Sequence, residues 1–126
     1  MNVLLSIKPE FVERIFDGSK KFEYRRKIFK RVEIKKVIIY ATSPISKVVG
    51  EFEIDEIYFD SINKLWNRTK DLSGINKTYY ERYFSGLKFG YAIKIKSAIK
   101  YDIALSIQEK YHINAPQSFV YVQEGI

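Results

Sequence analysis

The 126-residue chain contains no cysteine and only one histidine, His112. Without cysteine there are no disulfide bonds, no thiolate nucleophiles and no cysteine-ligated zinc or iron–sulfur sites. Apart from His112, only carboxylates remain as metal ligands, so we expect neither a metal site nor a cofactor. A chain without cysteine fits a reducing compartment, and we expect the protein to be cytoplasmic.

Long apolar runs are also missing. The first apolar run, residues 3–7, is short and follows no basic residue, so the N-terminus predicts neither a signal peptide nor a membrane span. Proline and glycine are scarce, with three and six residues, whereas 46% of the chain is hydrophobic and 16% is aromatic. This composition excludes a disordered or fibrous protein. We expect one globular domain, residues 1–126, that is monomeric and does not bind membranes.

Common catalytic motifs are absent as well. There is no Gly-x-Ser-x-Gly sequence, and a serine–histidine–acid triad would have to be built around His112, which lies near the end of a predicted helix. Gly86 and Gly90 lead into a predicted strand, whereas a phosphate-binding glycine loop leads into a helix. Serine-based catalysis and a glycine-loop nucleotide site are therefore poorly supported.

What the chain does contain is a concentrated positive charge. The segment from Lys20 to Lys36 contains nine basic residues and two acidic ones, Glu23 and Glu33. The net charge of this segment, +7, equals the formal net charge of the whole chain. A charge excess confined to one segment is typical of a protein that binds a phosphate-bearing partner. The alternative is a solvated basic hairpin that only keeps the protein soluble.

Hydrophobic periodicity predicts short strands interrupted by short helices. We expect helices where apolar residues recur at helical spacing behind a capping residue or proline, at residues 9–17, 61–69, 76–85 and 105–111. We expect strands where apolar residues alternate or form short runs, at residues 3–7, 20–26, 35–42, 47–59, 89–97 and 118–122. So many strands in one small domain predict an α+β, mostly β fold. Closure into a small barrel of about five to six strands, with two to four short helices, would remove the sheet edges.

The stretch "GSKKFEYRR", residues 18–26, raises the main functional question. Alternation places Phe22 and Tyr24 on one face and Glu23 and Arg25 on the other, which indicates either an ordinary solvated strand or a surface that binds an anion. Lys8 stands directly before the first helix, where its amine and the free backbone amides can form an anion site. The alternative for Lys8 is a flexible side chain in solvent.

Five blocks of the sequence, in order, are similar to one known family. They are "LLSIKPEFVERIFDGSKKFEYRR", "VIIYATSP", "VVGEFEI", "GYAIKI" and "APQSFVY". This order resembles the ASCH domain family, named for activating signal cointegrator homology, whose members have a PUA-like β-barrel. The first block is the most specific, with Gly18 and Lys20 followed at fixed spacing by Arg25.

The resemblance implies a cleft between the first helix and the barrel wall, which PUA-like relatives use to bind RNA or a nucleobase. It places Lys20 and Arg25 on this cleft, with Lys8, Thr42, Ser43 and Gln117 as lining candidates. Lys20 has the opposite parity to Arg25, so it reaches the same cleft only if it lies at the start of the strand or in a bulge.

The leading hypothesis is a module that binds RNA or a nucleotide in this basic cleft. Tyr24 and Phe29 are interleaved with the charges and can stack a base, although the alternation favours an inward position for Tyr24. The backbone of the nucleic acid is expected to contact Lys20, Lys21, Arg25, Arg26, Lys27, Lys30 and Arg31.

The alternative is an amidohydrolase, because some ASCH relatives act on N4-acetylcytidine with a lysine, a threonine and a glutamate. Lys20 matches the lysine and would act as base or nucleophile, with Glu23 as proton shuttle. Glu23 stands where those enzymes have the threonine, and the segment that carries their glutamate has none here. We therefore do not assign the activity to this chain, and a simple ion pair at the strand entry remains the competing role for Lys20 and Glu23.

Overall fold

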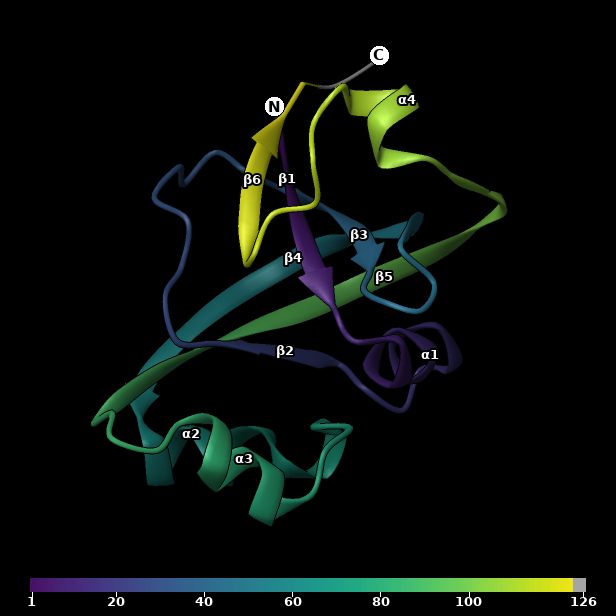
Figure 1. The fold of residues 1–126 in the computed structure, drawn as a ribbon. Coiled ribbons are helices and arrows are strands. Elements are labelled where there is room, and N and C mark those ends of the chain that lie inside the picture. Colours follow the sequence, from purple (N-terminus) through teal and green to yellow (C-terminus); the bar gives the residue numbers. More distant parts are fainter. Residues whose placement is uncertain (124–126) are drawn as a thin grey trace.

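The computed structural model describes residues 1–123 as a curved sheet with helices on its outside (Figure 1). Within these residues there are six strands, four α-helices and one 3-10 helix. The strands are β1 (Asn2–Ile7), β2 (Phe22–Arg25), β3 (Lys36–Ala41), β4 (Lys47–Ser61), β5 (Phe89–Leu105) and β6 (Phe119–Val122). The helices are α1 (Pro9–Asp17), α2 (Ile62–Thr69), η1 (Lys70–Leu72), α3 (Lys77–Tyr83) and α4 (Ile107–Tyr111).

The helices begin and end where local side chains permit. Helix α1 starts at Pro9 and ends at Gly18, which adopts the left-handed φ of 87° that glycine tolerates. The side chain of Asn76 accepts a hydrogen bond from the backbone N–H of Tyr79 and caps α3. Ser106 caps α4 in the same way, through the N–H of Glu109. The helix positions predicted from the sequence are confirmed, and none of the helices within residues 1–123 is long and apolar enough to cross a lipid bilayer.

The strands form one sheet in the order β2-β5-β4-β3-β1-β6. Strands β1 and β3 run parallel, and the other neighbouring pairs run antiparallel. The long hairpin of β4 and β5 has register shifts near Glu53 and Ile54. Such irregularities increase the local twist, and they accompany the bend of this hairpin around the rest of the sheet.

The mostly β, α+β fold is confirmed, but the prediction of a closed barrel was wrong. The sheet is open within the described residues, with β2 and β6 as its edges. A side chain bridges the open seam: the guanidinium of Arg25, at the end of β2, donates to the carbonyl oxygen of Ser6 in β1 at 3.0 Å and to the hydroxyl of Ser118, just before β6, at 3.3 Å. The guanidinium lies where a backbone ladder would have closed the barrel.

Three apolar clusters hold the fold together. The largest fills the inside of the curved sheet beneath α1, the second lies beneath α4, and the third packs α2 and α3 against β2 and β5. The third cluster contains the buried residues Phe22, Tyr24, Leu65, Tyr80, Phe84 and Ala92. Strand β2 is therefore covered on both faces, because its other face looks into the curve of the sheet, and all four of its residues are buried.

Candidate functional site

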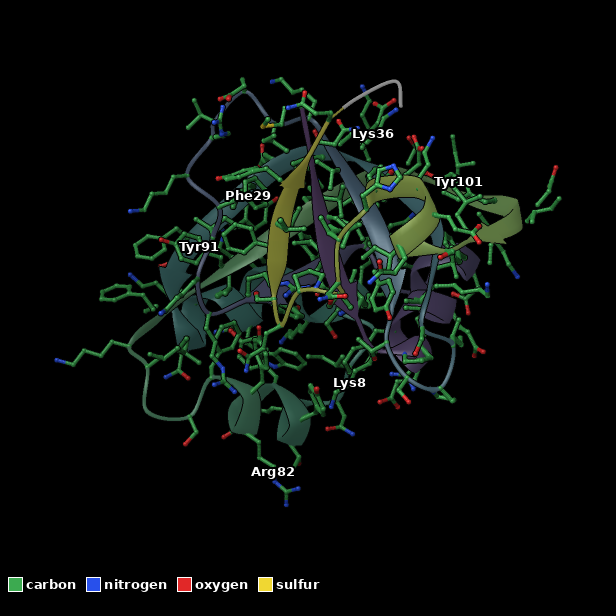
Figure 2. The ribbon with its side chains drawn as sticks, turned by 45° about the horizontal axis from the view of Figure 1, so that its top comes forward. Lys8, Phe29, Lys36, Arg82, Tyr91 and Tyr101 are labelled. Carbon is green, nitrogen blue, oxygen red and sulfur yellow. The ribbon has the colours of Figure 1, made fainter. Side chains whose placement is uncertain are left out.

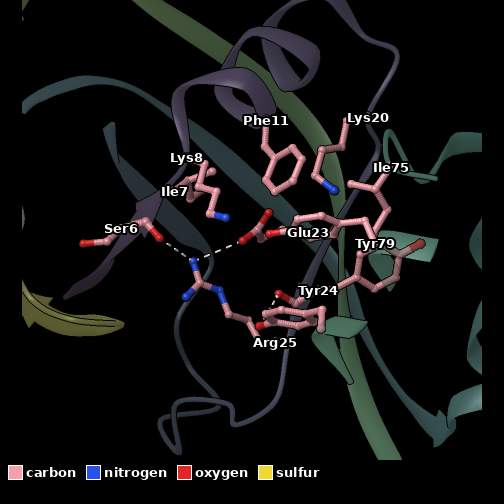
Figure 3. Close-up of a pocket in the computed structure, with 11 residues that line it drawn as sticks. Ser6, Ile7, Lys8, Phe11, Lys20, Glu23, Tyr24, Arg25, Ile75 and Tyr79 are labelled. Carbon is pink, nitrogen blue, oxygen red and sulfur yellow. Dashed lines mark hydrogen bonds and ion pairs between the residues drawn. The ribbon is translucent and has the colours of Figure 1, made fainter. Parts of the chain in front are cut away.

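A pocket of about 130 Å³ opens where β1 ends, α1 begins and β2 passes beneath α3 (Figure 3). It is lined by Ser6, Ile7, Lys8, Phe11, Lys20, Glu23, Tyr24, Arg25, Ile75, Tyr79 and Tyr83. The lining comes from segments far apart in the chain, because the curve of the sheet brings β1 next to β2 and the third apolar cluster fixes α3 beside them.

Lys20 lies in the wall of this pocket and is only 1% exposed. Its Nζ donates a hydrogen bond of 2.8 Å to the carbonyl oxygen of Ser73 and lies 5.2 Å from the ring centre of Phe11 and 5.0 Å from that of Tyr24. Burial lowers the pKa of Lys20 to about 8, although the carboxylate of Glu23 opposes the shift. An appreciable fraction of this amine is therefore neutral at mildly alkaline pH.

The stem of Lys20 fits against Gly74. This glycine has φ of 68°, and a Cβ built on it would lie 2.4 Å from the Cβ of Lys20 and 2.5 Å from its Cγ. Glycine is thus required here both by its backbone conformation and by the space that the lysine occupies. Lys20 itself precedes β2, with its backbone N–H bonded to the carbonyl oxygen of Arg14, so it reaches the pocket from the start of the strand.

The lowered pKa of Lys20 predicts a rise in stability above neutral pH. Between the folded value of about 8 and the unfolded value of 10.5, the unfolded chain binds more protons, so the free energy of unfolding increases with pH. Below pH 8 the full cost of burying the charged amine is present. Tyr24 acts in the opposite direction above pH 10, because burial raises its folded pKa to about 12.

The test is urea unfolding followed by the fluorescence of Trp66, in steps between about pH 7 and pH 10. Lys20→Met is the control, because methionine keeps much of the apolar stem but does not titrate. The rise should be absent from this variant; a rise of the same size in both proteins would show that other groups cause it.

Glu23 and Arg25 form a buried ion pair in the floor of the pocket. They are 6% and 9% exposed, and an Nη of Arg25 lies 3.1 Å from a carboxylate oxygen of Glu23. Figure 3 shows Lys8, Lys20 and Arg25 pointing toward the space around Glu23. The Nε of Arg25 is buried and has no hydrogen-bond partner among the described residues. The stretch "GSKKFEYRR" is therefore not an ordinary solvated strand, because three of its five charged residues, Lys20, Glu23 and Arg25, line the pocket.

Aromatic rings form the opposite wall of the pocket. Phe11 and Tyr79 meet edge to face at 5.1 Å, and the Nζ of Lys8 lies 5.3 Å from the ring centre of Tyr79. The hydroxyl of Tyr83 donates to the carbonyl oxygen of Tyr24 at 3.0 Å, which fixes its ring beside β2. The pocket therefore combines flat apolar surfaces with cationic groups and one carboxylate.

The structure brings four of the sequence-predicted residues to this pocket: Lys8, Lys20, Glu23 and Arg25. The other eight do not line it: Lys21, Arg26, Lys27, Lys30, Arg31, Thr42, Ser43 and Gln117. Thr42 and Ser43 lie in the turn after β3, and Gln117 is exposed next to Ser118. Most of the remaining basic residues follow β2 in the loop of residues 26–35, where Arg31 pairs with Glu33 at 3.5 Å.

Several lining residues were not identified from the sequence. The sequence could have indicated Phe11 as a lining residue, because it lies one turn after Lys8 in a helix that begins with proline. Tyr79 and Tyr83 are separated by four residues, which puts them on one face of α3, away from the buried Tyr80. Ser73 and Gly74, which hold Lys20, had no signal, because their contact depends on a segment more than fifty residues away.

No group of three or more histidine, cysteine, aspartate or glutamate side chains within residues 1–123 could hold a metal ion. The carboxylate of the pocket, that of Glu23, is instead engaged by Arg25. The chemistry of the site is accordingly that of an amine, a guanidinium, a carboxylate and aromatic rings.

Residues 5–102 match the ASCH domain family, and the chain belongs to this family. The crystal structure of ASCH from Zymomonas mobilis superposes with a TM-score of 0.89 at 25% identity, covering 98% of this chain and 88% of that one. The similarity to the family that the sequence blocks indicated is therefore confirmed, together with the PUA-like fold.

Two further proteins have sequences similar to this chain. An ASCH domain-containing ribonuclease from Zymomonas mobilis is 32% identical over 83 residues, covering 66% of this chain and 56% of the relative. A large ribosomal subunit protein uL22 from Ureaplasma parvum is 28% identical over 121 residues. The match covers 96% of this chain but spans only 39% of the ribosomal protein's length.

Proposed function

We propose that this protein binds RNA and holds one nucleotide in the pocket between α1 and α3. The observation that carries the proposal is the convergence of Lys8, Lys20 and Arg25 with an aromatic wall on one pocket. The ASCH domain-containing ribonuclease supports RNA as the class of ligand, because that relative covers two thirds of this chain.

The pocket is suited to a base more than to a phosphate. Glu23 offsets part of the positive charge, and its carboxylate can accept a hydrogen bond from an exocyclic amino group of a base. The rings of Tyr79 and Phe11 provide surfaces on which a base can stack. Lys8 is exposed and begins at the mouth of the pocket, where it can reach the phosphate of the same nucleotide.

The loop that follows β2 supplies the cations for the rest of the backbone. Arg26, Lys27 and Lys30 are exposed, and none of them forms an ion pair with an acidic residue in the described part of the chain. This loop begins at Arg26, directly after Arg25 of the pocket. The phosphates on either side of the bound nucleotide can therefore contact the loop while the nucleotide itself occupies the pocket. The RNA-binding site thus extends from the pocket onto the loop of the same chain.

Affinity for single-stranded RNA is expected to fall steeply with salt. If six phosphates are contacted, the logarithm of affinity against that of salt concentration should have a slope of about −4, from about 0.7 per phosphate. Arg26→Glu combined with Lys27→Glu should weaken binding by at least about tenfold. Fluorescence anisotropy of a labelled oligonucleotide measures both effects.

The matched control is Lys94→Glu combined with Lys96→Glu, which reverses two charges on β5 that pair with Asp55 and Glu53. These changes should leave affinity nearly unchanged. Equal losses in the two double variants would refute the proposed location, and no binding of RNA at low salt would refute the function itself.

A second candidate function is cleavage of the bound RNA. The name of the ribonuclease relative and the lowered pKa of Lys20 favour it, because a neutral amine can take the proton from a ribose 2′-hydroxyl. Analysis of the same oligonucleotide on a denaturing gel tests this: cleavage by the parent chain that disappears in Lys20→Met supports it. The amidohydrolase alternative is less favoured, because the ion pair with Arg25 holds the carboxylate of Glu23 and the relative with a named activity acts as a ribonuclease.

A further inference from the structure

Three aromatic side chains lie together on the sheet beside the pocket, two of them exposed and the third, that of Tyr91, half-buried, and none of them lines the pocket. Phe59 and Phe89 are stacked, with ring centres 5.4 Å apart and an interplanar angle of 20°. The ring centre of Tyr91 lies 4.8 Å from that of Phe59, on the same face of the sheet. Phe59 is 55% exposed and Phe89 is 51% exposed, so both residues are open to solvent. We call these three residues the aromatic platform.

The platform adjoins the pocket through the sheet itself. Arg25 on β2 is paired with Tyr91 on β5, and Tyr91 is paired with Phe59 on β4. These three residues form one row across neighbouring strands, and their side chains share one face. Because strands are spaced by about 4.8 Å, Phe59 lies roughly 10 Å from Arg25 along the sheet. A nucleotide chain can cover this distance in two steps.

Helices cover the opposite face of the same strands but not the platform. Tyr58, the neighbour of Phe59, points the other way and packs against Phe22 beneath α2. Figure 1 shows α2 and α3 on that side only, and Figure 2 shows Tyr91 at the periphery, where the loop after β2 departs. An exposed cluster of stacked rings is uncommon on a monomeric protein and marks a binding surface.

The surrounding charge indicates the occupant. The loop that starts beside Tyr91 carries Arg26 and Lys27, and neither pairs with an acidic residue within residues 1–123. The guanidinium of Arg26 lies over the ring of Tyr83, 4.9 Å from its centre. The acid nearest in sequence to the platform, Asp60, is held by Arg68 at 3.2 Å. Aromatic rings beside cations that have no acidic partner match single-stranded nucleic acid, whose bases stack on rings while its phosphates bind the cations.

We propose that Phe59, Phe89 and Tyr91 stack the bases of a single-stranded RNA segment that continues from the pocket past Arg25. This inference rests on the proposed function, since it extends the same site to a longer ligand. The protein would then bind single-stranded RNA in preference to duplex RNA, because bases that are paired and stacked in a duplex cannot stack on the platform.

The test compares two RNA lengths in two matched variants. The platform variant is Phe59→Ala with Phe89→Ala, and the control is Ile99→Ala with Ile103→Ala, which removes two apolar side chains that are 60% and 78% exposed elsewhere on β5. The probes are a dinucleotide, one nucleotide of which occupies the pocket, and an oligouridine of about ten nucleotides. The platform variant should bind the longer RNA about tenfold more weakly and the dinucleotide equally well, and the control should bind both normally.

The possible results distinguish RNA binding in the pocket from base stacking on the platform. If the parent protein binds neither RNA, the proposed function and the platform both fail. If it binds the longer RNA and the platform variant matches it, only the platform is refuted. Sedimentation that shows a dimer of the parent chain but not of the platform variant would assign the surface to self-association and overturn the proposal. Phe59→Tyr with Phe89→Tyr keeps both rings and should restore binding, which excludes misfolding as the cause of the loss.

Discussion

Replacing Arg25 with methionine is expected to lower the free energy of unfolding by about 3–5 kcal/mol. The change leaves the carboxylate of Glu23, which is 6% exposed, buried without its partner. It also removes the hydrogen bonds to Ser6 and Ser118 that bridge the open seam of the sheet. Both losses act on the same strand, so the edge at β2 should be the part most affected.

Urea unfolding measured through Trp66 tests this expectation against two further variants. Arg31→Met removes an exposed pair with Glu33 and should cost less than about 1 kcal/mol. Combining Arg25→Met with Glu23→Gln removes both buried charges and should recover part of the lost stability. If Arg25→Met costs no more than Arg31→Met, the buried ion pair does not stabilise the fold in the way described.

Replacing Gly74 with alanine should lower the free energy of unfolding by about 2–4 kcal/mol. One contribution is the left-handed backbone, with φ of 68°. The other is steric, since the new methyl group would lie 2.4 Å from the Cβ of Lys20, which is buried and has little room to move. Displacing Lys20 toward solvent should also raise its pKa and weaken the increase in stability above pH 8.

Gly86 provides the matched control for this substitution. It has a similar φ of 83°, but a Cβ built there meets no atom within 4 Å. Gly86→Ala should therefore show the backbone cost alone, about 1–2 kcal/mol, and an unchanged dependence of stability on pH. Equal losses in the two glycine variants would mean that the contact with Lys20 contributes nothing.

Local signals in the sequence were enough to place the helices. Pro9 and Gly18 bound α1, and Asn76 caps α3, because such residues act within one turn of the chain. The polar face of β2 was harder to interpret. Alternation puts Glu23 and Arg25 on one side, but whether that side meets water depends on β1 and β6, which are distant in sequence.

The same limit explains which parts of the site were predictable. The similarity to the ASCH domain family drew attention to Lys20 and Arg25, and the structure brings both to one pocket with Lys8. The expected barrel closure failed because a side chain, not a backbone ladder, spans the seam. The sequence pattern could not distinguish the aromatic platform from core residues. Tyr58 and Phe59 are adjacent aromatic residues, but Tyr58 packs against Phe22 whereas Phe59 is exposed.

The fit of Lys20 against Gly74 has a consequence for how such sequences can change over time. The atom nearest to a Cβ at position 74 would be the Cβ of Lys20, which every residue except glycine carries, so a shorter residue in place of the lysine does not make room for a side chain there. The φ of 68° also disfavours a side chain at this position whatever the space. Position 74 should therefore remain glycine in descendants of this chain, including those that replace Lys20. A descendant that lost the amine would keep this glycine, so the lysine could return by a single substitution.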